Sequence, residues 1–176
     1  MKPDTPARYG TLSRLLHWGM ALLVVWQVLK IFDRIDDGEH WVGQTLVPWH
    51  VSIGTLIGVL VLIRIAWALR NRQRRPAAPQ PPLLGFVARA GHVLLYVGLV
   101  LMPVTGISFL VGSGYGLTAF GVQLIPGGAE IPWLAALGST LHVPLAWLLI
   151  LLVAGHAGAA LWHHFVRKDG VLRRML

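Results

Sequence analysis

The sequence predicts an all-α integral membrane protein, folded as a four-helix bundle with no attached soluble domain. Hydrophobic residues make up 55% of the 176 residues and charged residues only 12%, with a mean hydropathy of +0.64. This composition is too apolar for an ordinary soluble domain. Four apolar runs each reach the length of about 20 residues that a membrane-spanning helix needs. They leave room only for short loops and tails, so we expect a single membrane domain over residues 1–176.

The four predicted spans are Leu12 to Ile31, Trp49 to Leu69, Phe86 to Val111 and Leu141 to Phe165. The first span could instead be a cleaved signal peptide, because basic residues precede it. It is longer than a usual signal core and lacks a small-residue cleavage site, which favours a retained helix. The first connection is polar and the second is basic, then proline-rich. The third, from Gly112 to Gly138, is rich in glycine and carries one charge, Glu130.

The charge distribution predicts the orientation of these spans. With four spans, the tails and the second connection share one side, which carries thirteen of the fifteen cations: Lys2, Arg8, Arg14, Arg64, Arg70, Arg72, Arg74, Arg75, Arg89, Arg167, Lys168, Arg173 and Arg174. Only Lys30 and Arg34 fall on the other side. Cytoplasmic loops of membrane proteins carry such an excess, so we expect both termini to be cytoplasmic. The net charge of +8 is then explained by topology and lipid headgroups, and nucleic acid is not an expected partner.

The spacing of four histidines is the main functional signal. His142 and His156 are fourteen residues apart, close to four helical turns, so they share a face of the fourth span about 21 Å apart. In the predicted topology, His17 lies at the cytoplasmic depth of His156. His50 lies at the outer depth of His142. The depths therefore predict two pairs, His17 with His156 and His50 with His142.

Imidazoles held inside a bilayer are costly and usually functional. A haem iron takes two nitrogen ligands from opposite sides of its ring, at matching depth and from different helices. Both predicted pairs meet this requirement, so we expect two b-type haems stacked across the membrane. The absence of cysteine excludes disulfides, thiolate-bound iron–sulfur clusters and c-type haem attachment. A haem-free protein whose histidines bind zinc or carry protons is the remaining alternative.

Several other residues have two interpretations. Arg64 lies fourteen residues after His50 and either pairs with haem propionates or extends to the inner headgroups. His92 could replace His17 as a ligand, contact a propionate or quinone, or be a simple interfacial residue. His163 and His164 could bind a metal, relay protons or lie at the interface.

Small residues beside the histidines also have two interpretations. Gly54 and Gly58 follow His50 on one helix face, and Gly155 and Gly158 flank His156. They either make room for a flat macrocycle or allow close helix packing.

The chain resembles the bacterial cytochrome b561 family of small four-helix, di-haem inner-membrane proteins. The resemblance extends from about Tyr9 to the C-terminus. It rests on these motifs in order: Leu16-His17-Trp18, His50-Val51-Ser52-Ile53-Gly54, Gly91-His92, Pro103-Val104-Thr105-Gly106, His156, Trp162-His163-His164 and Lys168-Asp169. It implies axial ligands at His17, His50, His142 and His156, and electron exchange with ubiquinone.

The leading hypothesis is a di-haem oxidoreductase of the bacterial inner membrane that exchanges electrons with ubiquinone. By similarity to the family, superoxide is the expected electron donor. The alternative is a cytochrome b subunit that carries electrons for a dehydrogenase or hydrogenase partner. Activity of the isolated protein with superoxide and quinone separates the two hypotheses.

Overall fold

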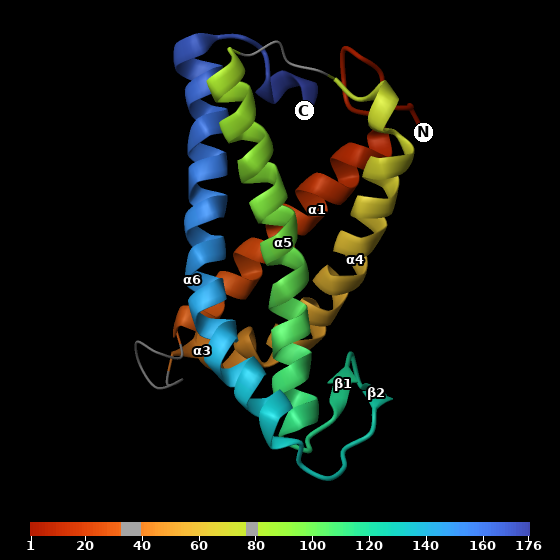
Figure 1. Ribbon diagram of the computed structural model, residues 1–176, viewed down its shortest axis with the longest axis vertical. Helices are drawn as coiled ribbons and strands as arrows, with labels where there is room; N and C mark the ends of the chain where they lie inside the picture. Colours follow the sequence, from red (N-terminus) through yellow and green to blue (C-terminus); the bar gives the residue numbers. More distant parts are fainter. Residues whose placement is uncertain (33–39, 77–80) are drawn as a thin grey trace.

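The computed structural model describes residues 1–32, 40–76 and 81–176. The acidic stretch 33–39, which includes Arg34, and residues 77–80 of the proline-rich connection lie outside the described residues. Four long helices form the molecule: α1 (Thr11–Val28), α4 (His50–Arg70), α5 (Pro82–Gly112) and α6 (Pro132–Trp162). The packed pairs are α1 with α4, α4 with α5, and α5 with α6. Helix α1 runs obliquely across the other three (Figure 1).

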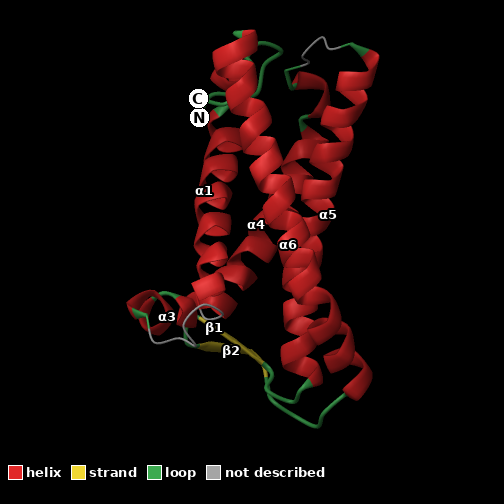
Figure 2. Ribbon diagram, turned by 90° about the vertical axis from the view of Figure 1, so that its left-hand side faces the viewer, coloured by secondary structure: helices red, strands yellow, loops and turns green. Residues whose placement is uncertain are grey.

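Short elements complete the described chain. These are η1 (Leu29–Phe32), α3 (Trp41–Thr45), η2 (Val47–Trp49), η3 (Arg72–Arg74), the π-helical turn η4 (His163–Arg167), η5 (Leu172–Arg174), and the strands β1 (Leu117–Ala119) and β2 (Val122–Ile125). The strands and α3 lie at the end of the bundle opposite the two chain termini (Figure 2). We call the two ends the terminal end and the hairpin end.

The hairpin corrects the all-α prediction. Strands β1 and β2 pair antiparallel, with Leu117 opposite Ile125 and Ala119 opposite Val122. The residues between them, Phe120 and Gly121, both have positive φ, at 51° and 77°. This is the turn geometry that usually selects Asn-Gly or Asp-Gly. Phenylalanine stands at the first turn position, so the sequence lacks the dipeptide that would predict a hairpin. The strands, with three and four residues, are too short to show a periodicity.

Three helical segments of the described chain are long and apolar enough to cross a membrane: Trp41–Arg70, Pro82–Gly112 and Pro132–Arg167. Helix α1 is shorter, with 18 residues, and carries Arg14 and Gln27 among its apolar side chains. The long helices expose large apolar residues, such as Leu151 of α6 at 69%. Extensive apolar exposure of this kind marks a surface that faces lipid or a partner. The structure is therefore that of a mostly helical membrane protein.

The terminal end is closed by contacts between the two ends of the chain. The Tyr9 amide donates a hydrogen bond to the Arg174 carbonyl at 3.1 Å. The Trp18 indole donates to the Met175 carbonyl at 2.9 Å. Both termini thus lie at the same end of the bundle (Figure 1).

The buried core is an apolar layer in the middle of the bundle. It consists of Met20, Ile53, Ile57, Val61, Leu99 and Leu149. Leu149 is midway in sequence between His142 and His156, and Gly98 of α5 lets its side chain approach the α5 backbone. A dry layer of packed aliphatic side chains therefore separates the two histidine levels.

Candidate functional site

At the terminal end, the structure brings His17 of α1 and His156 of α6 together. Their ring centroids are 6.1 Å apart, with an interplanar angle of 76°. His92 of α5 is also close, with its ring centroid 5.3 Å from that of His156. The His92 Nδ1 donates a hydrogen bond to the Ala88 carbonyl of its own helix at 2.6 Å. Three histidines from three helices thus meet at this level.

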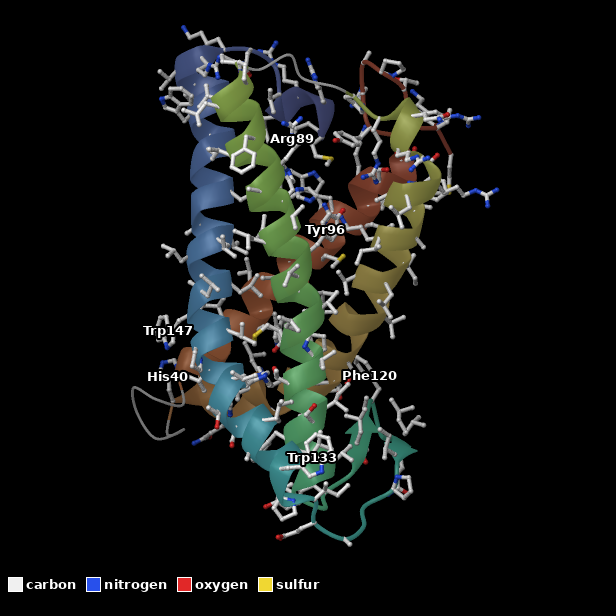
Figure 3. All side chains as sticks on the ribbon, viewed as in Figure 1. His40, Arg89, Tyr96, Phe120, Trp133 and Trp147 are labelled. Carbon is white, nitrogen blue, oxygen red and sulfur yellow. The ribbon has the colours of Figure 1, made fainter. Side chains whose placement is uncertain are left out.

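Arg64 of α4 reaches the same level. Its Nη2 lies 3.0 Å from His17 Nδ1. Its guanidinium lies over the ring of Tyr96, 5.5 Å from the centroid. Tyr96 is labelled on α5 in Figure 3. A guanidinium only donates hydrogen bonds, so His17 Nδ1 is the acceptor in this arrangement. The structure therefore places Arg64 inside the bundle beside a predicted ligand.

At the hairpin end, His50 of α4 faces His142 of α6. Their ring centroids are also 6.1 Å apart, with an interplanar angle of 80°. Gln27 of α1 donates from Nε2 to the His50 carbonyl at 3.0 Å, which ties α1 to the first turn of α4. The four predicted residues thus form two pairs, one at each end of the apolar core.

Thr105 of α5 orients His142. Its Oγ1 lies 3.0 Å from His142 Nδ1, and also 2.9 Å and 3.0 Å from the carbonyls of Leu101 and Met102. In the His142 tautomer with Nδ1 protonated, the single Thr105 hydroxyl hydrogen goes to one of these two carbonyls. The hydroxyl oxygen then accepts from His142 Nδ1–H. This hydrogen bond leaves the Nε2 lone pair of His142 available to a metal.

If His50 and His142 bind a haem, we expect Thr105→Val to weaken its binding by about tenfold, because the variant removes a hydroxyl acceptor for His142 Nδ1–H. Valine matches threonine in shape but lacks the hydroxyl. Haem titration of the apoprotein measures the change. Unchanged affinity at this level would show that Thr105 does not orient His142.

Gly106 sets the position of the same imidazole. A Cβ atom at this position would lie 3.2 Å from His142 Cε1, tighter than an ordinary contact. We expect Gly106→Ala to push the ring by a few tenths of an ångström and to shift the midpoint potential of the haem held there. Gly91→Ala, in the same helix, is the control, because a Cβ there meets nothing within 4 Å. Equal effects of the two variants in a redox titration would contradict this role.

The other glycines divide between the two interpretations. A Cβ on Gly54 would lie 3.1 Å from Gln27 Nε2, and one on Gly58 would lie 3.2 Å from the Pro103 ring. These two glycines allow close helix packing. Gly155 and Gly158, on either side of His156, have nothing within 4 Å of the added Cβ, so the space beside them is open.

The geometry of both pairs fits a haem iron. Imidazoles that bind one iron from opposite sides, through metal–nitrogen bonds of about 2 Å, place their ring centroids about 6 Å apart. Both pairs have this separation. Within the described residues, no group of three or more His, Cys, Asp or Glu could hold a bare metal ion. A porphyrin supplies four ligands itself and needs only two from the protein, so paired histidines suit it.

Comparison with known proteins identifies the family. Residues 8–176 match the family model described as prokaryotic cytochrome b561. The chain belongs to this family. The cytochrome b561 homolog 2 of Escherichia coli K12 is 33% identical, over 98% of this chain and 93% of its own. A probable superoxide oxidase, CybB of Yersinia pestis, is 31% identical over 96% of each chain. The cytochrome b562 of Cereibacter sphaeroides is 30% identical over 96% of this chain and 94% of its own.

Membership confirms the family expected from the sequence motifs. The chain is thus a membrane electron-transfer protein of a haem b-binding family. Sequence reasoning missed two residues near the histidines, Thr105 and Tyr96. Thr105 stands within the Pro103-Val104-Thr105-Gly106 motif, but nothing in the sequence shows that it faces His142. Tyr96 lies seven residues before Pro103 in an apolar stretch of α5 and carries no comparable signal.

Proposed function

We propose that this protein is a di-haem oxidoreductase that carries electrons across the bilayer between superoxide and ubiquinone. The observation that carries the proposal is the pair of facing imidazoles at each end of the bundle, both with ring centroids 6.1 Å apart. His17 and His156 would hold one haem b, and His50 and His142 the other. The bound haems supply one-electron redox chemistry.

The chain itself contributes orientation, spacing and a dry interior. Along α6, the fourteen residues from His142 to His156 set the two levels roughly 21 Å apart. Met20, Ile57 and Leu149 fill the interval and exclude water from it. Thr105 holds the proton of His142 on Nδ1, which directs Nε2 toward the pair partner. These residues fix the electron path without reacting themselves.

Arg64 has a separate role in the proposal. Metal ligation through His17 Nε2 requires the ring proton on Nδ1, and a guanidinium cannot accept that proton. Arg64 must therefore leave the His17 ring when the site is loaded. Its planar fork is then free to bind a carboxylate, such as a propionate, at the same level. If the propionate vibrational bands of an Arg64→Gln variant were the same as those of the unaltered protein, this role would be contradicted.

The proposed orientation places both termini in the cytoplasm of a bacterial cell and α1 as a fourth span in the inner membrane. Two facts support it: thirteen of fifteen cations fall on the side of the tails, and both termini lie at one end of the bundle. An even number of crossings follows from that arrangement. The test fuses to the C-terminus a reporter enzyme that works only outside the cytoplasm. Activity of this reporter would contradict the proposed orientation.

Superoxide as donor is taken from the relative named probable superoxide oxidase. The overall reaction converts two superoxide anions, one ubiquinone and two protons to two molecules of oxygen and one ubiquinol. The test supplies purified protein with enzymatically generated superoxide and a short-chain ubiquinone, and measures ubiquinol. We expect protein-dependent ubiquinol formation that is lost in His142→Leu. A preparation with both haems but without this activity would favour the subunit of a dehydrogenase or hydrogenase.

A further inference from the structure

The chain folds back on itself where α6 ends. After the π-helical turn η4, Lys168 adopts φ +53° and Gly170 φ +73°. These two left-handed residues reverse the chain and bring Arg173 of η5 next to η4. The resulting cavity, of about 220 Å³, is lined by His164, Phe165, Lys168, Gly170 and Arg173. A non-glycine residue at positive φ is strained, so the surrounding contacts hold this reversal in place.

The position of Arg173 is fixed by the chain end around it. The carbonyls of Arg174 and Met175 accept hydrogen bonds from the Tyr9 amide and the Trp18 indole. The terminal main-chain oxygen of Leu176 accepts one from the Arg8 guanidinium. Three contacts to the N-terminal segment and α1 thus hold the tail against the bundle, and the cavity is preorganised.

The cavity carries uncompensated positive charge. The carboxylate of Asp169, next to Lys168, lies 2.5 Å from His163 Nδ1 and 3.8 Å from the Arg167 guanidinium. The hydrogen bond from His163 lowers the pKa of Asp169, so this carboxylate is ionised and already paired. Among the described residues, no acidic side chain forms an ion pair with Lys168 or Arg173.

The rim of the cavity is apolar on its membrane side. Phe165 is 67% exposed and Val166 is 64% exposed, directly after the apolar helix α6. The Phe165 ring contacts that of His164, with centroids 4.7 Å apart. Cationic residues therefore follow exposed apolar ones at the end of the apolar segment Pro132–Arg167. A phospholipid has the complementary order, with an anionic phosphate above its acyl chains.

We propose that this cavity binds the phosphate of an anionic phospholipid headgroup. Lys168 and Arg173 supply the charge, His164 supplies a ring N–H, and Phe165 contacts the start of an acyl chain. Basic pockets at the ends of membrane helices bind lipid headgroups in this way, through local charge near the membrane surface. Free phosphate would meet the same cations but would leave Phe165 exposed, so the apolar rim favours the lipid.

Native mass spectrometry of the detergent-purified holoprotein tests the proposal. The probe is phosphatidylglycerol, with phosphatidylcholine as the neutral comparison. We expect Lys168→Gln/Arg173→Gln to weaken phosphatidylglycerol binding by about tenfold or more. The matched control is Arg72→Gln/Arg74→Gln, which removes the same charge from the exposed turn η3 at the same end. Its loss should stay below about threefold.

Three outcomes would overturn the proposal. Equal losses in both double variants would mean diffuse charge attraction rather than a site. Equal binding of phosphatidylcholine, whose phosphate is neutralised by a choline cation, would mean that the cavity does not select a headgroup with net negative charge. Displacement of the lipid by millimolar inorganic phosphate would mean a free-anion site. Haem content, which neither double variant should change, is the folding control in each case.

Discussion

Replacing His142 with leucine is expected to remove one of two haems and leave the other bound. The imidazole faces His50 with ring centroids 6.1 Å apart, and no other histidine ring is recorded in contact with it in the described chain. Leucine retains bulk and apolarity but has no lone pair for iron. Absorbance spectra and the pyridine haemochrome count per chain measure the loss. His50→Leu should give the same product, because both residues belong to one pair.

The matched control for this prediction is His40→Gln. His40 also lies at the hairpin end, where it caps the short helix α3 by accepting a hydrogen bond from the Val42 amide at 3.3 Å. It belongs to neither pair, so its replacement should leave the haem count unchanged. A purified His142→Leu variant with both low-spin haems would show that the pairing at this end is wrong.

Replacing His156 with leucine is expected to remove the other haem, and the partner of His156 can be identified by two further variants. His17 and His92 both face His156, at 6.1 Å and 5.3 Å between ring centroids. Only the longer separation leaves room for an iron between two imidazoles, which needs about 6 Å. We therefore expect His17→Leu to lose this haem and His92→Leu to retain it.

The two single variants give opposite results under the competing assignment. Loss of the haem in His92→Leu, with retention in His17→Leu, would make His92 the ligand and His17 a neighbouring residue. Low-temperature spectra distinguish the two haems when their bands differ, and the haemochrome count gives the stoichiometry in each case. Both variants should be compared with His142→Leu, which acts at the opposite end of the bundle.

The long helices and the two histidine levels could be anticipated because both depend on regular geometry. Apolar runs of about 20 residues show where long helices form, and a helical rise of 1.5 Å per residue converts sequence spacing into depth. His142 and His156 therefore mark two levels in any straight helix that contains both. The structure places His50 and His17 at these same two levels.

The missed features depend on contacts between helices, which periodicity does not reveal. The contact of Thr105 with His142 depends on how α5 and α6 are rotated, and that of Arg64 with His17 depends on how α1 and α4 are rotated. The hairpin at Phe120 depends on two successive positive φ angles in a turn without asparagine or aspartate. The fold-back at Lys168 likewise depends on a residue with positive φ, which no sequence motif predicts.

The number of haems in the purified, unaltered protein shows whether each of the two facing histidine pairs binds a haem. A reduced-minus-oxidised spectrum and a pyridine haemochrome count, from cells grown with adequate haem supply, give the number of b-type haems per chain. Two facing histidine pairs predict two low-spin b-type haems per chain. One haem would contradict one of the pairs. A colourless preparation would contradict haem binding at both pairs.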